Sequence, residues 1–278
     1  MFNIPLRLIA AALVTAAVLA GCAALDTKQG EWIFSPTDRT WGNTAELASG
    51  MDEAWARFDS KISGKPAKVH LLINGNDADK PMLLYLHGAR WNVVGSAWRI
   101  ERMRELGFNV VAVDYRGFGR SDADAPSEAK AYEDAHAAWL WIAQHHPDQP
   151  RYIFGHSLGG AIAIELATRV NDERGTLVEG TFTSIPDVFS TLKWGWLPVG
   201  WLISQRFDSE KKVAHIGSPL LVVHGSEDRL IAPELGRRLY DAALEPKRFV
   251  LVEGGSHHNT NGLGQTQYRA AIKEMFGL

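Results

Sequence analysis

Gly155-His156-Ser157-Leu158-Gly159 is the stretch that decides the fold of this chain, because it places a serine between two glycines at a change of secondary structure. The apolar run before it, residues 151–154, is typical of a short buried strand, and residues 158–170 after it are typical of a helix. A strand that turns directly into a helix strains the serine backbone and crowds its neighbours, so both glycines have a mechanical purpose. The pentapeptide predicts a nucleophile elbow, with the Ser157 hydroxyl at a helix N-terminus that favours negative charge.

A serine at such an elbow needs a carboxylate and a histidine later in the chain. Asp228 follows the apolar run at residues 219–224, and His257 follows the next apolar run, at residues 248–252. An imidazole takes the proton that makes serine a nucleophile, and a carboxylate fixes the tautomer of that imidazole. The order Ser157, Asp228, His257 therefore predicts a catalytic triad.

Neighbouring residues offer alternatives at two of these positions. Glu227, or Asp187 after the preceding strand, would also supply a carboxylate, and His258 competes with His257 as the base. The two adjacent histidines also resemble a pair of metal ligands. Adjacent loop residues seldom bind one ion together, however, and the chain has no H-E-x-x-H or paired-cysteine spacing. We therefore favour Asp228 and His257 and expect no metal.

A second loop is expected to stabilise the negative charge that develops on the substrate oxygen. Residues 82–86 are typical of a buried strand, which leads into His87-Gly88-Ala89-Arg90. The N–H of Ala89 and the N–H of Leu158 are the expected oxyanion donors, and Arg90 is the alternative to Ala89.

Apolar strands and amphipathic helices alternate along most of the chain, which favours a parallel sheet with helices on both faces. The predicted strands lie near residues 69–73, 82–86, 109–113, 151–154, 177–182, 219–224 and 248–252, and the predicted helices near 96–106, 128–145, 158–171, 233–243 and 266–276. A chain of 278 residues, 46% hydrophobic and 22% charged, is long enough to bury such a core as one domain.

Five motifs together resemble those of one large family. They are Leu86-His87-Gly88, Asp114-Tyr115-Arg116-Gly117-Phe118-Gly119-Arg120-Ser121, Gly155-His156-Ser157-Leu158-Gly159-Gly160, His224-Gly225-Ser226-Glu227-Asp228 and Gly255-Ser256-His257. Over residues 65–278 the chain resembles the α/β-hydrolases of the serine-hydrolase type, in the branch of BEM46-like and ABHD13/ABHD17-like hydrolases and the serine aminopeptidase-like domain. The resemblance implies the α/β-hydrolase fold, with an eight-stranded, mostly parallel sheet, and no cofactor.

Two details of these motifs carry expectations of their own. Where relatives often carry Asn after His-Gly, this chain has Ala89-Arg90-Trp91, so Arg90 is expected to face the substrate. In the charged stretch at residues 114–121, an Asp and an Arg beside glycines are expected to fix the loop backbone rather than to do chemistry.

The long connection between the last two predicted central strands is expected to form a small cap at residues 184–217. It contains an aromatic run with Trp194, Trp196 and Trp201. These tryptophans are expected to line an acyl pocket or to enter a lipid interface, and plain packing of the cap on the domain is the alternative.

The N-terminus predicts export and a lipid anchor. Arg7 is the only charge in the first 21 residues, and the apolar run at residues 8–20 is too short for a usual membrane span, which indicates a signal peptide. Leu19-Ala20-Gly21-Cys22 resembles the processing box of bacterial lipoproteins, in which the cysteine is acylated. The single cysteine of the chain is Cys22.

These features divide the chain into three parts. We expect a signal peptide at residues 1–21, a lipid-anchored tether and N-terminal extension at 22–65, and the hydrolase domain at 66–278. The apolar stretch at residues 32–36 is expected to pack on the domain. The anchor places the protein in the bacterial cell envelope, and Ala23, where some inner-membrane lipoproteins carry aspartate, favours the outer membrane.

Together the patterns predict a lipid-anchored serine hydrolase that cleaves carboxylic esters, such as acylglycerols, lysophospholipids or thioesters, through an acyl-enzyme. One alternative is a peptidase, which needs a site for a substrate amine; no acidic cluster near the cap indicates one. A noncatalytic scaffold is the other alternative, against which the complete triad argues. A net charge of −3 and the lack of a basic patch exclude nucleic acid as an expected partner.

Overall fold

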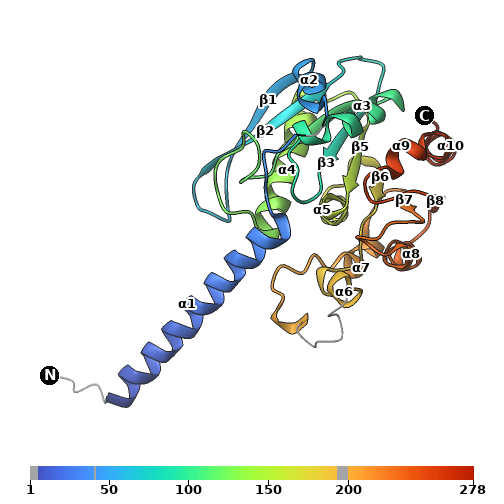
Figure 1. Cartoon of the computed structure of the whole chain (residues 1–278). Coiled ribbons are helices and arrows are strands. Elements are labelled where there is room, and N and C mark those ends of the chain that lie inside the picture. Colours follow the sequence, from blue (N-terminus) through green and yellow to red (C-terminus); the bar gives the residue numbers. More distant parts are fainter. Residues whose placement is uncertain (1–5, 41, 193–199) are drawn as a thin grey trace.

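The computed structural model describes residues 6–40, 42–192 and 200–278. Within these residues eight strands form one sheet in the order β1-β2-β4-β3-β5-β6-β7-β8 (Figure 1). They are β1 (Asp52–Asp59), β2 (Pro66–Asn74), β3 (Met82–Leu86), β4 (Asn109–Val113), β5 (Arg151–His156), β6 (Glu173–Glu179), β7 (Leu220–Gly225) and β8 (Lys247–Val252). The β1–β2 and β2–β4 pairs are antiparallel and the other pairs are parallel, which confirms the predicted mostly parallel sheet.

The helices in the described residues are α1 (Leu6–Phe34), α2 (Thr44–Ser49), α3 (Ala97–Glu105), α4 (Glu128–His145), α5 (Leu158–Ala167), α6 (Ile185–Ser190), α7 (Ser209–Lys212), α8 (Pro233–Ala242), α9 (Thr260–Leu263) and α10 (Gln265–Phe276), with 3-10 turns η1 (Val94–Ser96), η2 (Gly200–Leu202) and η3 (Val213–His215). Of these helices, α3, α4, α5, α8 and α10 lie close to the predicted positions, and the others were not predicted. Ser127 caps α4 by accepting a hydrogen bond from the Lys130 N–H. Pro233, whose φ is already helical, opens α8.

The core has two halves, one on each face of the sheet. Successive side chains of a strand point to opposite faces, so Leu84 and Leu86 of β3 join one half while Leu83 and Tyr85 join the other. The first half contains residues of α4, α5 and α8, and the second contains residues of α2, α3 and α10. All five residues of β3 are buried, because helices cover both faces.

The sheet begins earlier in the chain than the sequence indicated. β1 pairs with β2 along its whole length, from Asp52 opposite Ile73 to Asp59 opposite Pro66. The domain boundary expected at residue 66 is therefore corrected, since the supposed extension supplies the first strand. Most of β1 is exposed or half-buried, as befits an edge strand, so it lacks the continuous apolar run that marks the central strands.

The cap and α1 lie on one side of the molecule (Figure 1). Between β6 and β7 the chain forms α6, η2, α7 and η3, within the segment expected as a cap, while Trp194 and Trp196 lie outside the described residues. α1 extends away from the body, which its C-terminal end contacts. Among the residues that the structure describes, no helix is long and apolar enough to cross a membrane.

Candidate active site

Ser157 lies at the junction between β5 and α5, in the strained conformation that an elbow requires. Its φ is +56° and its ψ is −121°, in a region that residues other than glycine rarely adopt. A Cβ added at Gly155 would lie well under 3.0 Å from the carbonyl of Gly159, and one added at Gly159 would lie equally close to the carbonyl of Leu86. The two glycines are therefore required by close backbone approach on both sides of the serine.

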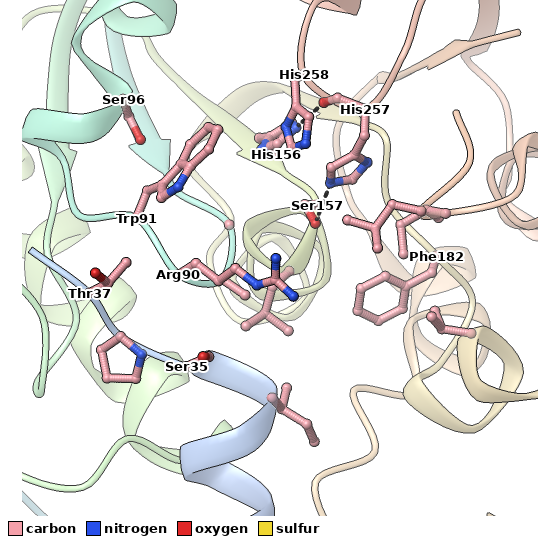
Figure 2. Close-up of a pocket in the computed structure, with 18 of the residues that line it drawn as sticks. Ser35, Thr37, Arg90, Trp91, Ser96, His156, Ser157, Phe182, His257 and His258 are labelled. Atoms are coloured by element: carbon pink, nitrogen blue, oxygen red, sulfur yellow. Dashed lines mark hydrogen bonds between the residues drawn. The ribbon is translucent and has the colours of Figure 1, made fainter. Parts of the chain in front are cut away.

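The structure brings Ser157, His257 and Asp228 into one hydrogen-bonded chain at the carboxyl ends of the strands (Figure 2). The Ser157 Oγ lies 3.0 Å from the Nε2 of His257. The Nδ1 of the same imidazole lies 2.7 Å from the Oδ2 of Asp228. An ionised Asp228 can only accept a hydrogen bond, so Nδ1 carries the proton and Nε2 is left to accept from the serine hydroxyl.

The Asp228 carboxylate is held in its ionised form by its surroundings. Its Oδ1 accepts the backbone N–H groups of Leu230 and Ile231, each at 2.9 Å. Burial by itself would raise the pKa of this carboxyl, but hydrogen bonds from His224, His257 and the Ile231 amide hold that pKa well below its usual range. A permanent negative charge therefore faces the imidazole.

The residues that were alternatives for the carboxylate and the base lie elsewhere. Asp187 accepts the hydroxyls of Thr183 and Ser184, at 2.6 and 2.8 Å, in the first turn of α6. Glu227 is exposed, and the carboxylate that accepts a hydrogen bond from the imidazole is that of Asp228. His258 is exposed, and its ring lies against that of Trp91 rather than between the serine and a carboxylate.

The loop expected to supply an oxyanion donor, residues 87–91 and here called the oxyanion loop, reaches the same cavity from the end of β3. Ala89 and Leu158 both line this cavity, and Leu158 opens α5, so its N–H lacks an acceptor within the helix. The N–H of Arg90, the alternative donor, is engaged by the carbonyl of Phe34 at 2.7 Å. This geometry favours Ala89 over Arg90 as the second donor. The Tyr115 hydroxyl donates to the His87 carbonyl at 3.0 Å and holds the start of the loop.

A buried polar network beneath the histidine loop was missed by the sequence analysis. Arg99 of α3 donates to Glu179 at 3.1 Å and to the carbonyl of His258 at 3.2 Å. His156 bonds to the carbonyl of His257 through its Nε2, at 3.1 Å, and burial, with Arg99 close by, lowers the pKa of its imidazole well below the usual value. No local pattern marks Arg99, because only the packing of α3 against the sheet shows that it is 6% exposed.

The charged stretch at residues 114–121 fixes a loop, in line with its structural interpretation. The Asp114 carboxylate accepts the Val93 N–H at 2.8 Å. The Arg116 guanidinium is buried and donates to Asp134 at 2.7 Å. These bonds connect the loop after β4 to its neighbours and leave neither charge in the cavity.

The cavity beside Ser157 measures about 880 Å³. Its apolar walls come from two places: Trp32 and Ile33 near the end of α1, and a group on the cap side, which comprises Phe182, Ile185, Val188, Leu230 and Ile231. The guanidinium of Arg90 points into it (Figure 2), and Arg39 also lines it. No Asp or Glu belongs to the lining that the described residues form.

The structure corrects the expected pocket in one respect. Trp201 is 79% exposed and is not among the residues that line the cavity. Trp32 lines the cavity instead, together with Trp91 and Phe182, although its segment was expected only to pack on the domain. A sequence does not specify which of two distant segments covers an active site, since that depends on how both dock.

Comparison with known proteins finds relatives among hydrolases. A family model described as "Serine aminopeptidase, S33" matches residues 77–207. The chain is 31% identical to the uncharacterized protein YfhR of Escherichia coli over 234 residues, 81% of this chain and 79% of that protein. It is 35% identical to the lysophosphatidylserine lipase ABHD12 of Danio rerio over 187 residues, and it spans about half of that protein, 48%, with 60% of its own length.

Solved structures share the fold at low sequence identity. The Pyrococcus furiosus esterase Pf2001 superposes with a TM-score of 0.65 at 16% identity, covering 87% of this chain and 97% of the esterase. The likeness to the esterase shows that the two proteins share a fold, and the similarity to YfhR shows that the two chains belong to one family. The sheet order, the elbow and the sequence relatives lead to one conclusion: the chain belongs to the α/β-hydrolase superfamily.

Proposed function

We propose that the chain is a serine hydrolase that cleaves carboxylic esters through an acyl-enzyme on Ser157. The observation that carries this proposal is the hydrogen-bonded chain from Ser157 through His257 to Asp228, at a strained elbow that faces a cavity. The serine oxygen attacks the ester carbonyl as its proton passes to the Nε2 of His257, and Asp228 stabilises the imidazolium. The N–H groups of Leu158 and Ala89 bind the oxyanion. The imidazolium then protonates the leaving alcohol, and water, activated by the same imidazole, releases the acid.

The cavity supports an ester with an apolar acyl chain and an anionic group. Its apolar walls suit an acyl chain, and the guanidinium of Arg90 lies next to the reacting serine. No carboxylate among the described residues lies within ion-pair distance of Arg90, so its charge is free to bind an anion. Among acylglycerols, lysophospholipids and thioesters, this combination best fits a lysophospholipid with an anionic head group, a class to which the substrate named for ABHD12 also belongs.

The peptidase alternative has less support from the cavity. An aminopeptidase must bind the positively charged amine of its substrate, for which a carboxylate is the natural partner. The described lining offers arginines and no Asp or Glu. An ester-to-amide rate ratio close to one, measured with esters and amides of the same acyl group, would favour the peptidase.

Covalent labelling with a fluorophosphonate tests the proposed nucleophile. We expect one adduct, located at Ser157 by mass spectrometry, and no labelling of Ser157→Ala. The same preparations are assayed with p-nitrophenyl esters and then with a lysophospholipid and a monoacylglycerol of equal acyl length. A well-folded wild-type chain that neither labels nor hydrolyses these esters would support the noncatalytic scaffold instead.

The site of action is part of the same proposal. Cys22 is exposed and lies in the processing-box sequence, eight residues before Gly30 in α1. Acylation there would attach the enzyme to the membrane of the cell envelope, next to lipid esters. Several acyl chains hold a protein at a bilayer stably, because burial contributes about 0.8 kcal/mol per CH₂ group.

A further inference from the structure

We propose that residues 29–37, the end of α1 and the turn after it, form a clamp that positions the oxyanion loop. The proposal rests on the proposed function, since it takes Ala89 as an oxyanion donor. The clamp ends fifty residues before the oxyanion loop begins, and Figure 2 shows Ser35 and Thr37 of the clamp beside Arg90 and Trp91 of the loop. The clamp positions the loop and takes no part in the reaction, although Trp32 and Ile33 of the same segment also line the cavity.

The clamp binds the backbone of Arg90 on both sides. The Arg90 N–H donates to the Phe34 carbonyl at 2.7 Å, and the Arg90 carbonyl accepts the Thr37 N–H at 2.9 Å. Thr37 and Trp91 also form an isolated parallel bridge. Arg90 has a φ of +74°, which an L-residue adopts at a cost of about 1–3 kcal/mol unless its surroundings impose it. The two bonds from the clamp supply that constraint.

This constraint bears directly on the oxyanion donor. The Phe34 carbonyl fixes the peptide group between Ala89 and Arg90. If that peptide group turned, the Ala89 Cα would move with it and the Ala89 N–H, in the preceding peptide group, would be displaced. The oxyanion donors must lie about 2.7–3.1 Å from the developing charge, and therefore a small reorientation of the loop weakens catalysis. The opposite end of the loop is held by Tyr115, whose hydroxyl binds the His87 carbonyl.

The side chain of Phe34 ties the clamp to the same support. Its ring is fully buried and lies edge-on to the rings of Tyr115 and Phe207, with centroid distances of 6.4 and 5.8 Å. Phe34 therefore binds the loop through its carbonyl and packs against the tyrosine that holds the start of the loop. Phe34, which lies outside the expected hydrolase domain, thus holds one end of the oxyanion loop directly and packs against the residue that holds the other end.

The clamp is itself held by contacts that lie away from the cavity. The side-chain amide of Gln29 donates to the Leu202 carbonyl at 2.8 Å and accepts the Ser204 N–H at 2.8 Å. Gly30 passes so close to the Pro126 carbonyl that an added Cβ would lie well under 3.0 Å from this oxygen. Gly30 and Gln29 do not line the cavity, so a change there alters the clamp without removing a substrate contact.

The test is a comparison of Gly30→Ala with Gly21→Ala in the full-length chain, produced without processing so that residue 21 is retained. Both glycines are in α1, but an added Cβ at Gly21 meets no atom within 4 Å. The readouts are kcat and KM for p-nitrophenyl acetate, whose acyl group is too small to depend on the cavity walls, the pH profile of kcat/KM, and the rate of fluorophosphonate labelling.

For Gly30→Ala we expect kcat and the labelling rate to fall at least about tenfold, towards the 10²–10³-fold loss that removal of an oxyanion donor causes. KM should stay within about twofold and the pH profile should keep its shape, since the triad is not displaced. Gly21→Ala should match the wild type. An unchanged kcat in a folded Gly30→Ala chain, a change in KM alone, or a shifted pH profile would each overturn the clamp.

A second pair of variants decides the matter if Gly30→Ala does not fold. Thr37→Pro removes both the side-chain hydroxyl and the N–H that binds the Arg90 carbonyl. Thr37→Ala also removes the hydroxyl but keeps that N–H. The clamp predicts a kcat for Thr37→Pro at least about tenfold below that of Thr37→Ala, and equal values overturn it. A wild-type chain without activity or labelling would instead refute the proposed function, which separates the two failures.

Discussion

Steric crowding at single glycines controls the geometry of Ser157. Gly159 lies in the first turn of α5, where alanine would ordinarily favour the helix by about 1 kcal/mol. Here an added Cβ would run into the carbonyl of Leu86, which no side-chain movement can relieve. We expect Gly159→Ala to lower the free energy of unfolding by about 3 kcal/mol or more. Urea denaturation measures this, with Gly217→Ala, where the nearest atom lies at 3.8 Å, as the tolerated control.

The proposed role of Asp228 is tested by changing its charge and little else. Asp228→Asn keeps the size of the side chain but no longer stabilises the imidazolium or fixes its tautomer, so kcat should fall about 10⁴-fold while the chain stays folded. Glu227→Gln removes a neighbouring charge that is exposed and should leave kcat within about twofold. Equal losses in the two variants would contradict the assignment of Asp228.

Two buried histidines make stability depend on pH. Burial lowers the pKa of the imidazoles of His87 and His156 below the ordinary 6.5, so both are neutral in the folded chain at pH values where the unfolded chain is protonated. Their contribution is present above about pH 6.5 and is lost as the pH falls below it, by up to about 1.4 kcal/mol per pH unit for each group. Urea denaturation between pH 7.5 and 5 measures how steeply the free energy of unfolding depends on pH. His156→Gln should reduce that slope by the contribution of one proton, up to about 1.4 kcal/mol per pH unit.

Strand β1 and the turn after it belong to the hydrolase domain, so the domain begins before residue 66. β1 covers the edge of β2, and Ser60, just after β1, accepts a hydrogen bond from the buried Arg116 at 2.9 Å. A chain that starts at residue 66 loses both and exposes the backbone edge of β2 to aggregation. We expect such a chain to be insoluble or to unfold without cooperativity, whereas a chain that starts at residue 23 folds. Thermal unfolding followed by circular dichroism distinguishes them.

At the scale of the whole molecule, α1 joins the proposed lipid anchor to the cavity. Ten helical residues separate Cys22 from Trp32 of the cavity wall, a rise of about 15 Å. The cavity would therefore lie close to the membrane surface. We expect Cys22→Ser to release the protein from membranes and to keep its kcat on a soluble ester within about twofold. Fractionation with carbonate washing measures the release, and a Cys22→Ser chain that stays on the membrane would contradict anchoring by the lipid alone.

Much of the fold and of the candidate site could be predicted from the sequence, because the relevant signals are local. The central strands are buried on both faces and read as continuous apolar runs, such as that of β3. Ser157 lies in a turn whose glycines are required by its own neighbours, and Asp228 and His257 follow strands whose carboxyl ends meet at one edge of a sheet. Local patterns therefore determined which residues meet at the site.

The tertiary structure alone decided what surrounds these residues. β1 was missed because an edge strand buries one face and carries a weaker pattern, and Arg99 because a buried arginine looks like any helical arginine until the helix is packed. Trp32, rather than Trp201, lines the cavity. Phe34 packs against Tyr115, which holds the start of the oxyanion loop. Contacts between segments far apart in sequence depend on how whole elements dock, which no short stretch of residues specifies.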